Sequence, residues 1–299
     1  QIPTSSFKPA SSGGKGHLSV SLPSIGLPIG SYGDLTGADC TPGTSCDSRI
    51  EVFLNGKPLL LARWPNINAS TGYWEWGSVK TALTQQPDAS FVISTAESSF
   101  CTNPATTQQL TAWAKESDLW THGYWGWDWA DTYARVGKVS PSNATIQLVG
   151  SNLHESTLKI AGLSAAKEYA VKTQVASGYP IKPKARVMIV NALSELDAPG
   201  EYFVDRKTGL LTLIPPSGST LSPSDEIFVS VNDTIVNLVN KTDVALEDLT
   251  IAYSRVSAVN ISNGNNVTLS NVTIHNIGGT AVMIDGSHNS ISDSSVQYV

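Results

Sequence analysis

A tract rich in aromatic and acidic residues runs from Trp120 to Asp131 and holds four of the chain's eight tryptophans. Aromatic faces bind sugar rings through C–H contacts, while neighbouring carboxylates accept hydrogen bonds from hydroxyl groups. The tract therefore predicts a substrate-binding surface made of His122, Trp125, Trp127, Asp128 and Asp131. The alternative is that these rings form the packed core of a small β domain, where tryptophan is commonly buried.

The catalytic residues stay unassigned, because no carboxylate pair has a convincing arrangement. Glycoside hydrolysis needs two carboxyl groups about 5–10 Å apart on opposite sides of a bond. Asp128 and Asp131 are three residues apart in one loop, and such pairs rarely face each other across a bond. Asp197, Glu201 and Asp205 lie beside turn residues and are interpreted as turn and hairpin chemistry.

The histidines do not form a metal-binding motif. His122, His275 and His288 are isolated from one another, and no H-E-x-x-H spacing occurs. His288 and Asp285 fall in a predicted loop and are a further, weaker candidate for a functional group. We therefore expect no metal and no cofactor.

The three cysteines indicate one small disulfide at most. Cys40 and Cys46 are six residues apart in a stretch rich in Gly, Pro and Thr, so a small disulfide loop is plausible, and Cys101 is then left over. No pair has C-x-x-C spacing, which argues against zinc.

Composition and charge exclude several classes of protein. The net charge of −6 argues against a nucleic-acid surface, and no apolar run approaches the roughly 20 residues of a membrane span. Asn-x-Ser/Thr sequons are frequent and favour a secreted, extracellular protein. They begin at Asn68, Asn143, Asn232, Asn240, Asn260, Asn266 and Asn271.

The last third contains an internal repeat with an offset of 22–23 residues. Apolar segments around Val236, Val259 and Val282 align at this offset, and alternation with period two points these valines inward. Asn237 and Asn260 alternate with them and are predicted to point outward, as a stacking ladder or a substrate contact. A leucine-rich repeat has a similar period, but its consensus Asn is missing. The repeat predicts the first coils of a right-handed parallel β-helix.

The first two thirds are predicted to be rich in short strands. Strong hairpin signals occur at Asn55-Gly56 and between the segments 201–205 and 210–214, and one helix is predicted over 105–120. We expect an all-β protein in which residues 1–222 form a barrel- or sandwich-like accessory domain and residues 223–299 form the β-helix coils.

Three segments carry a family resemblance: Phe53 to Asn66, Gly123 to Asp131 and Leu193 to Gly209. In this order they resemble a large group of right-handed β-helix proteins that includes glycoside hydrolases of the fucosidase and xylanase type. The resemblance implies an inserted β-rich domain near the start of the helix. It also implies a carbohydrate-active protein whose partner is a polysaccharide or other glycan.

Three functions remain open: a glycoside hydrolase, a non-catalytic extracellular protein that binds glycans or supports adhesion, and a polysaccharide lyase. The repeat still continues at Val299, so we expect further coils beyond it and, by the same resemblance, earlier coils before Gln1. Under the leading hypothesis the catalytic carboxylates lie mainly beyond Val299, and the 299-residue piece is inactive on its own.

Overall fold

The computed structural model of the chain describes residues 1–11, 14, 16–33, 35, 49–84, 89–149, 180–218 and 220–298. The chain divides into two compact units, Leu61–Ala198 and the combination of Gln1–Leu60 with Pro199–Val299. We call the first the barrel unit and the second the sheet unit. The division into one domain of residues 1–222 and a second of residues 223–299 stays a prediction.

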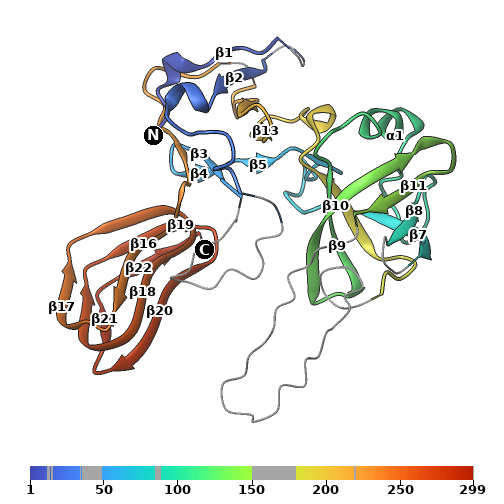
Figure 1. The fold of residues 1–299 in the computed structure, drawn as a ribbon. Helices are drawn as coiled ribbons and strands as arrows, with labels where there is room; N and C mark the ends of the chain where they lie inside the picture. Colours follow the sequence, from blue (N-terminus) through green and yellow to red (C-terminus); the bar gives the residue numbers. More distant parts are fainter. Residues whose placement is uncertain are drawn as a thin grey trace. The chain divides into compact units, whose positions relative to one another are not determined.

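Six strands of the barrel unit form a closed antiparallel barrel (Figure 1). They are β7 (Gly77–Thr84), β8 (Ser90–Ile93), β9 (Trp120–Trp127), β10 (Ala130–Ser140), β11 (Thr145–Leu148) and β12 (Arg186–Val190). They follow the order β12, β7, β8, β11, β10, β9, and the pairing of β9 with β12 closes the barrel. A short strand, β6 (Arg63–Trp64), also pairs with β12. Closure leaves these six strands without a free edge.

Large apolar side chains fill the core of the barrel unit. Trp125 of β9 is fully buried, and its ring centroid lies 5.6 Å from that of Phe91 in β8. Gly123 makes room for this ring, since a Cβ there would lie 2.9 Å from Trp125. Because side chains alternate along a strand, His122 and Tyr124 lie on the opposite, outer face of β9.

The described residues contain one α-helix, α1 (Thr107–Trp113), which adds Leu110 and Trp113 to the barrel core. Thr106 caps it in a capping box with Gln109. The helix predicted over 105–120 exists but is much shorter, because the chain enters β9 at Trp120 and the pairing of β9 with two neighbours outweighs helix propensity. The 3₁₀ helices are η1 (Thr4–Ser6), η2 (Pro23–Ile25), η3 (Pro141–Asn143) and η4 (Leu193–Glu195).

Two small antiparallel sheets belong to the sheet unit. One has the order β1 (Lys8–Pro9), β2 (Leu18–Ser21), β14 (Leu210–Leu213), β13 (Glu201–Asp205), β5 (Leu60–Leu61), and the other has the order β15 (Ile227–Val229), β3 (Val52–Leu54), β4 (Lys57–Pro58). The hairpin predicted at Asn55-Gly56 is confirmed: φ is 50° and 76° at these residues, and β3 pairs with β4. The hairpin of β13 and β14 is confirmed as well.

A seven-stranded parallel sheet contains the repeat (Figure 1). Its strands are β16 (Asn232–Val239), β17 (Thr242–Glu247), β18 (Thr250–Ser270), β19 (Thr273–Ile277), β20 (Thr280–Ser287), β21 (Ser290–Ser292) and β22 (Ser295–Gln297). Val236 pairs with Val259, and Val259 with Val282, which confirms the predicted register. Val259 and Ile261 are fully buried in the core of this sheet.

Bends in this sheet repeat with the same offset and carry ladders of polar side chains. Asn240 and Asn263 both have positive φ, as do Asp243 and Asn266, and short polar residues adopt that conformation most readily. The amide of Asn263 donates to Asn240 Oδ1 at 2.8 Å, and the amide of Asn266 donates to Asp243 Oδ1 at 2.6 Å. The repeat thus places each donor beside an equivalent acceptor.

The right-handed parallel β-helix predicted for residues 223–299 is not what the described strands form; they form a parallel sheet, so that prediction was wrong. A constant offset specifies which strands pair and in which register, but it does not specify how the connections run in space. The barrel- or sandwich-like accessory domain predicted for residues 1–222 agrees only loosely with the observed barrel. Every strand of the closed barrel lies within Leu61–Ala198. Of the other strands before residue 222, β6 pairs with the barrel strand β12, and the rest belong to separate sheets.

In the part of the chain that the structure describes, no helix has the length and apolar character needed to cross a membrane. Cys101 is buried and is not in a disulfide with any described residue. The predicted Cys40–Cys46 loop lies outside the described residues.

Candidate functional site

Four neighbouring strands bring aromatic residues together on the outer face of the barrel. His122 and Tyr124 point outward from β9 because they alternate with the buried Trp125. The register of β10 places Tyr133 beside His122, and that of β12 places Arg186 beside Tyr124. Sheet pairing therefore assembles the face from positions far apart in the sequence.

The rings of this face contact one another. His122 stacks on Tyr133 with centroids 4.3 Å apart and an interplanar angle of 7°. Trp76 directly precedes β7, and its ring centroid lies 5.7 Å from that of His122 and 5.3 Å from that of Tyr124. The Cζ atom of the Arg186 guanidinium lies 4.4 Å from the ring centroid of Tyr124 and 5.4 Å from that of Trp76. Both distances are within the range of cation–π attraction. The rings are therefore held in fixed positions.

The hairpin between β9 and β10 extends this face with two exposed tryptophans. Trp127 and Trp129 are 48% and 70% exposed, and their rings stack with centroids 6.5 Å apart. The Lys182 ammonium lies 4.0 Å above the Trp127 ring. We call Trp76, His122, Tyr124, Trp127, Trp129 and Tyr133 the aromatic face.

Two carboxylates lie among these rings. Asp131 Oδ2 is 2.5 Å from His122 Nε2, and Asp128 Oδ1 accepts from Arg186 Nη2 at 3.1 Å. The Asp131 side chain is 44% exposed and that of Asp128 is 88% exposed. Their remaining oxygens are open to a ligand, and hydroxyl groups are suitable partners for them.

The predicted site residues divide between the surface and the core. His122, Trp127, Asp128 and Asp131 all belong to the outer face or its hairpin. Trp125 instead lies in the barrel core and donates from Nε1 to Thr132 Oγ1 at 3.0 Å. The structure therefore brings four of the five residues to the outer side of the barrel, where His122 is only 9% exposed.

Sequence reasoning missed several members of this surface: Trp76, Tyr133, Lys182 and Arg186. Trp76 belongs to a short aromatic run, Tyr73-Trp74-Glu75-Trp76, just before β7, and Tyr133 is the one tyrosine of β10. The basic segment Lys182 to Arg186 was a usable signal, because two lysines and an arginine within five residues are conspicuous in a chain with few charges.

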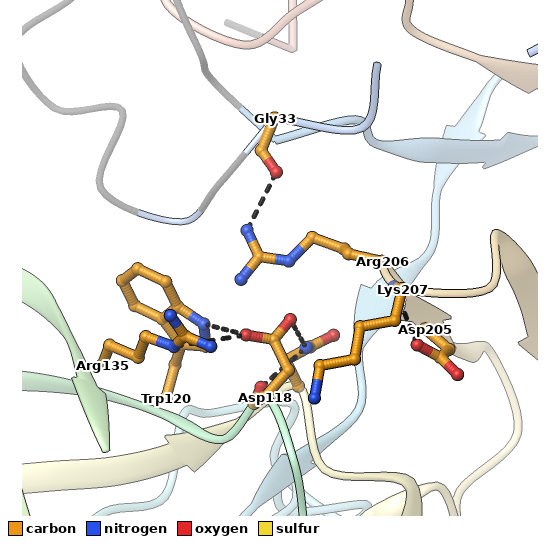
Figure 2. A network of polar contacts seen from close by, with 8 residues as sticks. Gly33, Asp118, Trp120, Arg135, Asp205, Arg206 and Lys207 are labelled. Atoms are coloured by element: carbon orange, nitrogen blue, oxygen red, sulfur yellow. Dashed lines mark hydrogen bonds and ion pairs between the residues drawn. The ribbon is translucent and has the colours of Figure 1, made fainter. Parts of the chain in front are cut away.

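A second group of polar contacts in the barrel unit centres on Asp118 (Figure 2). Trp120 Nε1 donates to Asp118 Oδ1 at 3.1 Å, and Arg135 Nε lies 3.7 Å from the same oxygen. Asn191 donates to the Asp118 backbone carbonyl at 3.0 Å. Because the Asp118 side chain is only 10% exposed, these contacts serve to fix the ends of β9 and β12.

Among the carboxyl groups that the structure describes in the barrel unit, that of Glu195, in η4, has the most perturbed pKa. It is 4% exposed and accepts from Trp113 Nε1 at 2.6 Å and from Gln109 Nε2 at 3.4 Å. Burial raises the pKa of Glu195 to about 7, although these two hydrogen bonds lower it. Its contacts link η4 to α1, so the structure favours a packing role.

The other acidic candidates lie in turns or sheets. Asp205 accepts from the backbone amide of Lys207 at 2.9 Å (Figure 2), as a turn-forming aspartate does. Asp197 accepts from Asn66 at 2.8 Å, and Glu201 is buried in β13. These contacts agree with the structural interpretation of all three residues.

The other two histidines considered as candidates, His275 and His288, lie in or beside strands of the parallel sheet. His275 contacts Tyr253 edge-on, with centroids 5.5 Å apart, and His288 Nδ1 lies 3.3 Å from Asn265 Oδ1. Among the described residues, no three or more His, Cys, Asp or Glu side chains are grouped as metal ligands would be.

No family model matches this chain, and no curated protein sequence matches it. Among solved structures, a chain described as "Glycoside hydrolase" has a similar fold, with a TM-score of 0.58 and 10% sequence identity. The match covers 92% of this chain and 48% of that one, so the chain spans about half the length of its structural neighbour. At this identity the similarity shows the fold alone.

These findings correct the predicted resemblance. Membership of the right-handed β-helix group was a wrong prediction, because the described strands form a closed six-stranded antiparallel barrel and a parallel sheet. What the comparison shows is an all-β chain with the fold of part of a protein described as a glycoside hydrolase.

Proposed function

We propose that this chain is part of a carbohydrate-active protein and binds glycan on the aromatic face of its barrel unit. The observation that carries the proposal is the clustering of six rings, of which Trp127 and Trp129 are exposed, with two accessible carboxylates on one side of the barrel. Sugar rings stack on such surfaces, and their hydroxyl groups bond to carboxylates. The description of the structural neighbour as a glycoside hydrolase supports the same class of ligand.

The geometry suits binding better than bond cleavage by these residues. Asp128 is paired with Arg186, and Asp131 is paired with His122, and neither lies in a closed cleft that would shield a transition state from water. We therefore assign the face to glycan recognition, and we propose hydrolysis only for the larger protein to which such a chain would belong.

A binding assay tests this proposal. Affinity electrophoresis and calorimetry against a panel of soluble polysaccharides should detect binding by the chain, and Trp127→Ala should weaken it about three- to tenfold. The matched control is Tyr73→Ala, which removes an aromatic residue of the same unit that is 74% exposed. If no polysaccharide binds, or if both variants weaken binding equally, the proposal is wrong.

We also propose that the protein is secreted and glycosylated, on the basis of its seven sequons. Asn143 is exposed at the end of η3 and should carry glycan, whereas Asn260 is 4% exposed and should not. Intact-mass and peptide mass spectrometry of protein expressed in a eukaryotic secretory pathway measures both. Occupancy at Asn260 with an empty Asn143 would contradict this assignment.

A further inference from the structure

The segment from Lys182 to Arg186 places three cations over three different aromatic groups. The Lys182 ammonium lies 4.0 Å from the Trp127 ring, and the Lys184 ammonium lies 3.7 Å from the Phe100 ring. Arg186 lies over Tyr124 and Trp76, as described above. Each positive charge thus lies over one face of an aromatic ring, within the range of cation–π attraction.

Backbone hydrogen bonds hold this segment in position. The Lys182 amide donates to the Trp125 carbonyl of β9 at 3.0 Å, and the Lys184 amide donates to the Val79 carbonyl of β7 at 2.7 Å. The segment is therefore anchored to both neighbouring strands, and its cations occupy defined places on the outer face.

A cavity of about 290 Å³ continues the aromatic face beyond Arg186. The link is β7, where Ser78 pairs with Arg186 and also lines the cavity. Lys80, Lys184 and Phe100 are among the residues that line it. This volume lies near the lower end of the range for small-molecule sites, so a single sugar ring has a suitable size for it. We refer to the aromatic face and this cavity together as the track.

The charges along this track are not cancelled by its acids. Asp128 forms an ion pair with Arg186, and Asp131 is hydrogen-bonded to His122, so neither acid contacts Lys182 or Lys184. In the described part of the chain, neither Lys182 nor Lys184 has a carboxylate within ion-pair distance, and the cavity contributes one acid, Glu97. Two lysines thus remain available for a negatively charged ligand, although the whole chain has a net charge of −6.

We propose that the aromatic face and its cavity select acidic glycans, with uronate carboxylates bound by Lys182 and Lys184 while the sugar rings stack on Trp127 and Phe100. This inference rests on the proposed glycan-binding function and specifies its ligand class. A neutral glycan offers no partner to the two ammonium groups, whereas a uronate offers each of them a charge-assisted hydrogen bond.

The experiment compares acidic polysaccharides with neutral forms that have the same sugar backbone. Polygalacturonate and its methyl ester form one pair, and alginate and its methyl ester form a second. We expect the wild-type chain to bind at least one acidic form about five- to tenfold more tightly than its ester, because two exposed ion pairs each contribute a modest amount to the affinity. Raising the salt concentration should remove this difference, since ions screen exposed charges.

Matched variants assign the preference to the two lysines. The double variant K182Q/K184Q should bind the acid and the ester equally, while K115Q/K138Q, which removes two other exposed lysines of the barrel unit, should keep the preference. Circular dichroism and thermal unfolding of each variant establish that the fold is retained.

The outcomes separate this inference from the proposed function. If the chain binds acid and ester equally, or if K115Q/K138Q loses the preference as K182Q/K184Q does, selection by this segment is refuted while glycan binding stands. If no glycan binds, both proposals fail. If polyphosphate binds as tightly as the acidic glycan and Trp127→Ala leaves that glycan's affinity unchanged, the segment binds polyanions in general and the inference is wrong.

Discussion

The parallel sheet and the aromatic face use polar side chains in opposite ways. In the sheet, amides bond to equivalent residues one repeat away, as Asn260 does with Asn237 at 2.8 Å and Asn271 with Asp248 at 2.7 Å. On the aromatic face, the charged groups come from positions with no repeat, and their carboxylates remain largely exposed. The comparison indicates that the periodic polar residues stabilise the fold, whereas the non-periodic ones are available for a ligand.

The largest effect is expected in the core of the parallel sheet. Val259→Asp buries an unpaired charge at a position with no exposed surface and should lower the free energy of unfolding by about 3–5 kcal/mol. Ile235→Asp is the control, because Ile235 is 38% exposed on β16 and the change there should be small. Denaturant unfolding followed by circular dichroism measures both. If the two variants lost the same free energy of unfolding, Val259 would lie outside the core.

Glu195 should produce a pH-dependent effect in the barrel unit. Its pKa rises from 4.5 to about 7 on folding, so the folded protein holds this proton more tightly than the unfolded chain. The contribution of this group to the free energy of unfolding is therefore at its maximum below about pH 4.5. It falls as the pH rises to about 7 and stays low at higher pH. Glu195→Gln should add about 3 kcal/mol at pH 8 and almost nothing at pH 4, since one pKa unit is worth about 1.4 kcal/mol.

Thermal unfolding at pH 4, 6 and 8 measures this difference between Glu195→Gln and the wild type. The matched variant is Glu97→Gln, in which the carboxylate replaced is exposed. If the stability difference between Glu195→Gln and the wild type were the same at all three pH values, Glu195 would have an ordinary pKa. Its hydrogen bonds would then offset the effect of its burial on that pKa.

The polar ladders should give a smaller effect, on stability alone. Asn260→Ala removes a buried amide and leaves Asn237 without its donor, which should cost about 1–2 kcal/mol. Asn263→Ala, at an exposed ladder position, should cost less. Neither change should alter glycan affinity. A loss of affinity in either variant would mean that the ladders contact the ligand.

The aromatic face should give the smallest effect on stability. Tyr124→Ala and Trp129→Ala remove rings from the outer surface, so we expect changes in unfolding free energy of about 1 kcal/mol or less, together with weaker glycan binding. Binding and unfolding measured on the same preparations separate the two roles. Strong destabilisation without a loss of binding would make the face a structural cluster.

Local patterns in the sequence were sufficient for the hairpins and for the strand register of the repeat. Asn55-Gly56 adopts the positive φ values that a type I′ turn needs, and few other dipeptides do so easily. Val236, Val259 and Val282 pair because a one-residue slip would expose the whole apolar set. Both features depend on neighbours in the chain or on a constant offset, which are visible in the sequence.

The barrel and its outer face were decided by tertiary structure. Closure depends on the pairing of β9 with β12, whose residues are more than 60 positions apart along the chain, and no local pattern specifies that partner. The same pairing sends Trp125 into the core while Tyr124 meets Arg186 outside. The aromatic tract coincides with β9 and its hairpin, but only the register of the neighbouring strands determined which of its rings are accessible, because alternation assigns adjacent residues to opposite faces.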